Sequence, residues 1–353
     1  MPVVSKETLR YFSRRLGGYG SVSIIDAIAA FVVSVALGRL HGAEVLGDYV
    51  FAQGLGILTS LLIGFGVNHS ILVQSARGDK DNGHLLRRAL RLSAVLQAAG
   101  VLLSIGVVWW VTAGNGDQRH TILFVILPSL ASFSAVMFAY GAGCDQLQPY
   151  VSVRLILGFF RVVILSVFFI AGASPIGFAL LLFGLECLVV MGGFFAVWRH
   201  HSAGLKGPWG FQYEDISWLR ASAHLGISQF VGQVTLRVDA VMIRLLLSRE
   251  AAGIYGAART LAAAPRILEN ALLLAITPKQ GKAATRGGVA LWSLTRRILA
   301  WVLCVTALEV LTLWILAPLL VTGIYGSDYS NSVLPMRLLL FALPLTGSAI
   351  ILR

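Results

Sequence analysis

The chain has 353 residues, 57% of them hydrophobic and only 12% charged, which excludes an ordinary soluble globular protein, in which about a quarter of the residues are charged. Its formal net charge of +12 would suit a nucleic-acid-binding protein, so the distribution of the basic residues has to be read before that class is accepted.

Long apolar runs recur along the whole chain, and many reach the roughly 20 residues that a helix needs to cross a bilayer. They lack the polar/apolar alternation of membrane β-strands, which favours helices. We therefore predict an all-α integral membrane protein, a polytopic bundle of about ten spans. In chain order these are 21–38, 47–68, 92–112, 121–143, 155–171, 176–197, 222–246, 253–276, 298–318 and 334–352.

The basic residues gather between alternate pairs of predicted spans. With the N-terminus inside, the inner segments hold 19 Lys and Arg residues, and five more lie within spans. The outer segments hold only four, Arg39, Arg119, Arg249 and Arg337. This bias follows the positive-inside rule, so it predicts a cytoplasmic N-terminus. The basic charge is then a topology signal, and we expect no nucleic-acid partner.

A short phrase occurs twice. "EVLGDYVFA" at 44–52 and "EAAGIYGAA" at 250–258 share Glu, Gly, Tyr and Ala at the same spacings, displaced by 206 residues. Chance identity in a biased composition is one explanation. The other, which we favour, is two homologous and parallel six-helix halves, because both phrases fall in the outer hairpin after an odd-numbered span.

These halves would divide the chain into an N-terminal six-helix bundle, 1–206, and a C-terminal bundle, 207–353, with its first four helices only. Two halves of 206 residues require 412, and the sequence has 353. We therefore expect a C-terminally truncated form that lacks about two helices or more. A naturally ten-helix protein is the alternative.

Three stretches resemble a known family. The stretch at 37–68, "LGRLHGAEVLGDYVFAQGLGILTSLLIGFGVN", looks like the first hairpin of the bacterial polysaccharide exporters. These exporters are the lipid-linked oligosaccharide flippases of O-antigen and capsule pathways, and they are related to the multidrug and toxin extrusion transporters. "LRVDAVMIRLLLSREAAGIYGAARTL" at 236–261 resembles the seventh and eighth helices of that family, and "IYGSDYSNS" at 324–332 resembles its loop before the tenth helix. The similarity covers most of 15–345.

The resemblance implies roughly twelve to fourteen helices in two bundles around a central cavity. It also implies a multi-pass protein of the bacterial inner membrane, surrounded by membrane lipids. Such a protein flips or exports an undecaprenyl-pyrophosphate-linked oligosaccharide by alternating access, and its transport can be coupled to protons or sodium ions. A cation-coupled multidrug extruder of the same architecture is an alternative, but it would favour an acidic cavity. A non-functional, truncated remnant of a flippase is another.

Ionisable residues inside predicted spans are costly and usually functional. We expect Arg161, Arg237, Arg259 and Arg266 to bind substrate, because guanidinium groups match phosphate oxygens. Asp26 and Glu186 are candidate ion-coupling carboxylates. The structural alternative is that these charges form internal salt bridges, or that the side chains of Arg244 and Arg259 extend outward so that their charged groups reach water. The remaining ionisable residues counted within spans are Asp239, Glu269 and Glu309.

Nothing in the sequence indicates an enzyme. No nucleophile–base pair, phosphate-binding loop or G-x-G-x-x-G motif is found, and the three cysteines, Cys144, Cys187 and Cys304, are scattered without metal spacing. We expect no catalytic residues, no metal site and no cofactor. A membrane glycan polymerase or ligase, which generally places its catalytic residues on long outer loops, is disfavoured because the outer loops predicted here are short.

Overall fold

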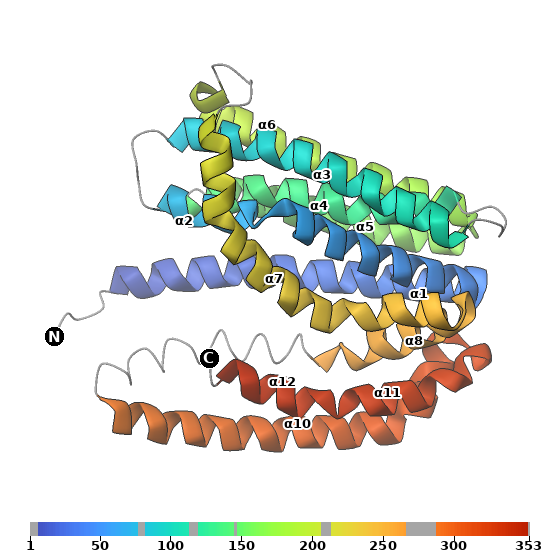
Figure 1. The fold of residues 1–353 in the computed structure, drawn as a ribbon. Helices are drawn as coiled ribbons and strands as arrows, with labels where there is room; N and C mark the ends of the chain where they lie inside the picture. Colours follow the sequence, from blue (N-terminus) through green and yellow to red (C-terminus); the bar gives the residue numbers. More distant parts are fainter. Residues whose placement is uncertain are drawn as a thin grey trace. The chain divides into compact units, whose positions relative to one another are not determined.

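The computed structural model describes residues 6–76, 82–112, 119–144, 147–205, 213–265 and 287–351. Throughout these ranges the chain is helical apart from short turns, which confirms the all-α prediction (Figure 1). The elements are α1 (Lys6–Gly64), α2 (Val67–Ala76), α3 (Asn82–Thr112), α4 (Arg119–Gly143), α5 (Leu147–Ile170), α6 (Pro175–Leu205), α7 (Tyr213–Leu246), α8 (Arg249–Ala262), α10 (Gly288–Tyr325), the 3-10 helix η1 (Ser327–Ser332), α11 (Val333–Leu340) and α12 (Ala342–Ile351).

Helix α1 contains the first predicted span, 21–38, and most of the second, 47–68. Its helical geometry is interrupted at Gly42, where φ is 79° and ψ is −178°. A residue with a side chain rarely adopts this conformation, so glycine permits the break. Helix α7 ends at Leu246, and α8 begins at Arg249. The non-helical Ser248 thus lies 206 residues after Gly42, the displacement of the repeated phrase.

Six helical segments of the described residues are long and apolar enough to cross a membrane: 24–64, 83–112, 119–143, 148–170, 175–200 and 292–325. The last predicted span, 334–352, is divided into α11 and α12 at Phe341. Pro344 explains this division, because its ring has no N–H to donate and clashes with the carbonyl of Leu340, the last residue of α11.

The described chain exposes large apolar side chains along its spans. On α5, Phe159 is 62% exposed and Ile170 is 84% exposed. Near the end of α3, Trp109 and Trp110 are both more than 70% exposed. An aqueous surface would not tolerate such faces, whereas lipid covers them and interfacial Trp residues sit at the level of the headgroups. The protein is therefore a multi-pass membrane protein.

The chain forms two compact units, one of residues 1–46 with 253–353 and the other of residues 47–252. In unit 47–252, α4 packs against α2, α3, α5 and α6, and α7 packs against α2 and α3. Figure 1 shows α3, α4, α5 and α6 running lengthwise beside one another. The core of this unit contains Ile71, Met137, Tyr140 and Val197, and Trp218 donates a hydrogen bond to the Gln74 side chain at 2.8 Å.

In unit 1–46 with 253–353, α10 packs against η1, α11 and α12. The hydroxyls of Ser34 and Tyr325 lie 2.8 Å apart, and the Tyr329 hydroxyl donates to the carbonyl of Gly38 at 3.2 Å. Burial raises the pKa of the Tyr329 phenol, so it remains a donor. Gly253 of α8 lies against the backbone of Ala43, where an added Cβ would be 1.8 Å from the carbonyl oxygen. This close helix contact requires glycine.

Candidate functional site

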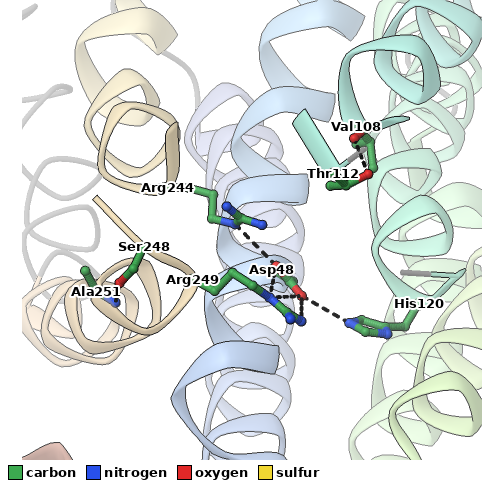
Figure 2. Close-up of polar contacts among 8 residues, drawn as sticks. All are labelled: Asp48, Val108, Thr112, His120, Arg244, Ser248, Arg249 and Ala251. Carbon is green, nitrogen blue, oxygen red and sulfur yellow. Dashed lines mark hydrogen bonds and ion pairs between the residues drawn. The ribbon is translucent and has the colours of Figure 1, made fainter. Parts of the chain in front are cut away.

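A buried carboxylate in unit 47–252 gathers three basic side chains. Asp48 lies six residues after the break in α1 and is only 2% exposed. The Nε of Arg249 lies 3.2 and 3.1 Å from its two carboxylate oxygens, and Nη2 of the same arginine contacts Oδ2. Arg244 Nε lies 3.4 Å from Oδ1, and His120 Nε2 lies 3.2 Å from Oδ2 (Figure 2). We call these four residues the Asp48 cluster.

Local sequence places each member of the Asp48 cluster. The Ser248 hydroxyl accepts a hydrogen bond from the Ala251 N–H at 3.0 Å, which caps α8 and fixes Arg249 as its first residue (Figure 2). Arg244, in the last turn of α7, lies over the Phe51 ring at 5.8 Å. His120, in the first turn of α4, packs edge-on against Phe124.

The Asp48 cluster holds one negative and two permanent positive charges, because arginine is always protonated. Arg244 is 8% exposed and needs the carboxylate, since a buried charge without a partner is costly. The side chain of Arg249 is 28% exposed and reaches the edge of the unit. The cluster therefore ties the end of α7 and the start of α8 to α1 and α4.

A second buried pair joins two of the predicted site residues. Arg161 of α5 donates from Nη1 to the Glu186 carboxylate of α6 at 3.2 Å, and the two side chains are 22% and 6% exposed. Tyr49 lies within electrostatic range of Arg161, Glu186 and Arg237. The structure thus pairs two of the predicted site residues, Arg161 and Glu186, within unit 47–252.

A third ionic group fixes the start of α7. Asp215 is fully buried and lies 2.8 Å from Arg88 Nε, and Arg91 contacts its other carboxylate oxygen. Both arginines belong to α3, and the sequence indicates them only as inner-side basic residues. Their pairing with Asp215 anchors α7 against α3.

The other predicted site residues are dispersed. Asp26 in α1 and Arg259 in α8 are half-buried and belong to the other compact unit. Arg266 and Glu269 lie outside the described residues. Asp239 accepts a hydrogen bond from the N–H of Ala240 at 2.8 Å.

Sequence reasoning missed Asp48 and His120. Asp48 stands inside the repeated phrase, where the second copy has Ile254, and a lone acid that departs from the repeat is the signal that would have revealed it. His120 carries no comparable signal. Its role depends on α4 packing in the same bundle as the second part of α1, which no local pattern shows.

The model of the family described as polysaccharide biosynthesis protein matches residues 17–280. No curated protein sequence matches the chain.

Solved transporters share the fold at low sequence identity. An inward-facing multidrug resistance MATE family transporter of the MOP superfamily matches with a TM-score of 0.74 and 11% identity, over 95% of this chain and 82% of that one. A MATE transporter in complex with MaD3S matches with a TM-score of 0.54 and 15% identity, over 97% and 80% of the two chains. A MOP superfamily transporter from Pyrococcus furiosus, described as having a binding pocket of reverse polarity, gives 0.52 and 11%, over 97% and 82%.

These likenesses show the fold, which is that of MATE and MOP superfamily transporters and agrees with the resemblance drawn from the sequence. The family match extends over most of the chain and includes the whole of unit 47–252 with its charged groups. The chain therefore belongs to the polysaccharide biosynthesis protein family.

Proposed function

We propose that the chain flips a lipid-linked oligosaccharide, an undecaprenyl-pyrophosphate-linked repeat unit, across the bacterial inner membrane by alternating access. The observation that carries the proposal is the match to the polysaccharide biosynthesis family over residues 17–280 in a chain with a transporter fold. A transporter that serves glycan synthesis needs a membrane path for a sugar and its anionic anchor, and it makes no covalent bond.

Arg161 and Arg237 are our candidates for contact with the pyrophosphate within unit 47–252. Both act electrostatically on Tyr49, and a guanidinium offers a planar pair of donors to phosphate oxygens. Arg259, in the other unit, and Arg266, outside the described residues, remain candidates on the strength of their positions in predicted spans.

The pairing of Arg161 with Glu186 supports a route to coupling. The Arg161 guanidinium cannot donate the same hydrogen bonds to the Glu186 carboxylate and to a substrate phosphate at once, so the substrate competes with Glu186 for Arg161. A proton taken up by Glu186 would release Arg161 for substrate. Glu186 therefore remains a candidate for proton or sodium coupling, with Asp26 as the second candidate carboxylate.

We also propose the two parallel halves, 1–206 and 207–353, and a cytoplasmic N-terminus. The coincident displacement of Gly42 and Ser248 supports the halves, and the bias of basic residues supports the orientation.

The test is complementation in a strain that lacks its own flippase and accumulates the lipid-linked oligosaccharide. We expect the full chain to restore surface glycan, and Arg161→Gln and Arg237→Gln each to lower it about tenfold or more, because a hydrogen bond to a charged group is lost. Arg220→Gln is the matched control, since Arg220 is exposed on the same helix, α7, as Arg237. Normal glycan with both variants would remove these arginines from the path. No glycan with the wild-type chain at normal expression would refute the function.

A further inference from the structure

Unit 47–252 contains a polar recess where α1 gives way to α2. The helix is interrupted at Phe65 and Gly66, whose φ values are 47° and 71°, inside the predicted span 47–68. Irregular backbone at membrane depth occurs where it is buried in protein or lines a polar cavity, and transporters place binding sites at such breaks.

Helix α7 packs directly over this break. A Cβ added to Gly66 would lie 2.5 Å from the backbone nitrogen of Gly226, so the two backbones meet without side chains between them. Beside this contact lies a small, partly open cavity of about 10 Å³. It is lined by parts of α1, α2, α3, α4 and α7, and no charged residue stands among its described lining residues.

A chain of amides and hydroxyls forms the wall of this recess. Gln97 Nε2 donates to the Ser60 carbonyl at 3.3 Å and to the Ser132 hydroxyl at 3.2 Å, and the Ser60 hydroxyl donates to Gln97 Oε1 at 2.8 Å. Asn68 Nδ2 donates to the Ser132 carbonyl at 3.3 Å. These bonds fix the amide planes and leave acceptor capacity on both amide oxygens.

One polar group of the recess has no partner. Ser93 of α3 is 2% exposed and lines the cavity, and within the described part of the chain its hydroxyl makes no hydrogen bond. Its oxygen is not among the fully buried polar atoms without a partner, so the hydroxyl opens into the recess, where a ligand group can replace the water that bonds to it. The first turn of α2 also lines the recess at Val67 and Asn68, and its next two N–H groups, of His69 and Ser70, donate to the Gly66 carbonyl at 3.0 Å.

We propose that this recess is a subsite for a neutral hydroxylated group, a sugar hydroxyl or acetamido group of the transported glycan. A phosphate would require cations, and the described lining of the recess has none; an apolar drug would require a mostly apolar wall, and only Leu61 and Val67 contribute apolar side chains. Mixed donors and acceptors without charge match sugar hydroxyls. The proposal rests on the proposed function and divides the substrate between two places: the recess takes one small polar group of the sugar, and the arginines near Tyr49 take the pyrophosphate.

The test is saturation-transfer NMR on the purified full chain with free N-acetylglucosamine and glucose as probes. We expect binding of at least one sugar, weakened about five- to tenfold by Ser93→Ala through the loss of one hydrogen bond, and abolished by Ser93→Leu, which fills the recess. Inorganic pyrophosphate should not compete. Ser104→Ala is the matched control: Ser104 lies about three turns further along α3 and bonds to Thr59 and Gly100 outside the recess, so its loss should leave sugar binding unchanged.

Equal sugar signals in all variants, no signal with the wild-type chain, or displacement by pyrophosphate would each overturn the subsite. The complementation assay distinguishes failure of the proposed subsite from failure of the proposed function. If the wild-type chain and Ser93→Leu restore surface glycan equally, the function stands and the subsite falls. If the wild-type chain restores none, the function falls whatever the NMR result.

Discussion

Replacing Asp48 by asparagine tests whether the Asp48 cluster stabilises unit 47–252. The substitution keeps the shape of the side chain and removes the only negative charge of the cluster. Arg244, at 8% exposure, then keeps its charge without a carboxylate. Removing one partner of a buried ion pair typically costs about 3–5 kcal/mol.

The structure places the expected cost at the lower end of this range. The Arg249 side chain is 28% exposed, so water replaces much of its interaction, and exposed pairs contribute only about 0–1 kcal/mol. The amide oxygen of the introduced asparagine can also still accept one hydrogen bond. We therefore expect Asp48→Asn to lower the free energy of unfolding by about 3 kcal/mol.

The assay is unfolding of the purified full chain in detergent, followed by tryptophan fluorescence, as a double-mutant cycle with Arg244→Met. The double variant should regain about 2 kcal/mol relative to Asp48→Asn, because methionine removes the stranded charge and fills its apolar surroundings. Glu250→Gln, at an exposed carboxylate in the first turn of α8, is the control and should cost less than about 1 kcal/mol. A small loss with Asp48→Asn, or no recovery in the double variant, would refute the reasoning.

Three further predictions concern packing, coupling and orientation. Gly253→Ala should destabilise the protein by about 1–3 kcal/mol or more, because its Cβ meets backbone, whereas Gly323→Ala, with no atom within 4 Å, should be neutral or stabilising in the same unfolding assay. Glu186→Gln should make glycan export insensitive to a collapsed proton gradient, and export that remains gradient-dependent would exclude it as the coupling group. A membrane-impermeant maleimide should label Leu247→Cys from outside intact cells and leave His200→Cys unlabelled, and the reverse result would invert the topology.

Much of the fold could be predicted because hydropathy reports directly on contact with lipid. The fourth span, predicted as 121–143, is α4 at 119–143. The interruption at Phe65 and Gly66 could not be predicted, because both residues lie within an apolar run and the break depends on α7 packing against it. The break at Phe341 had a local signal in Pro344, which hydropathy alone does not weigh.

The candidate site was less predictable because its contacts join distant helices. Arg237 and Arg244 are seven residues apart on α7 and so share a face of that helix, yet the structure gives them different surroundings: Arg244 contacts Asp48, whereas Arg237 acts electrostatically on Tyr49. The alternative of an outward-reaching Arg244 was wrong, since the residue is 8% exposed. Periodicity states which residues share a face of one helix, but not which helix that face meets.

The limits of the compact units bear on the proposed halves. The two limits fall after residues 46 and 252, which are 206 residues apart, as are the helix interruptions at Gly42 and Ser248. If the repeated phrase were a chance similarity of composition, there would be no reason for the helix interruptions or the limits of the units to be 206 residues apart as well. Each unit then combines the first helix of one half with later helices of the other. The copies differ where Asp48 faces Ile254 in the alignment, so the Asp48 cluster has no counterpart at the repeated position.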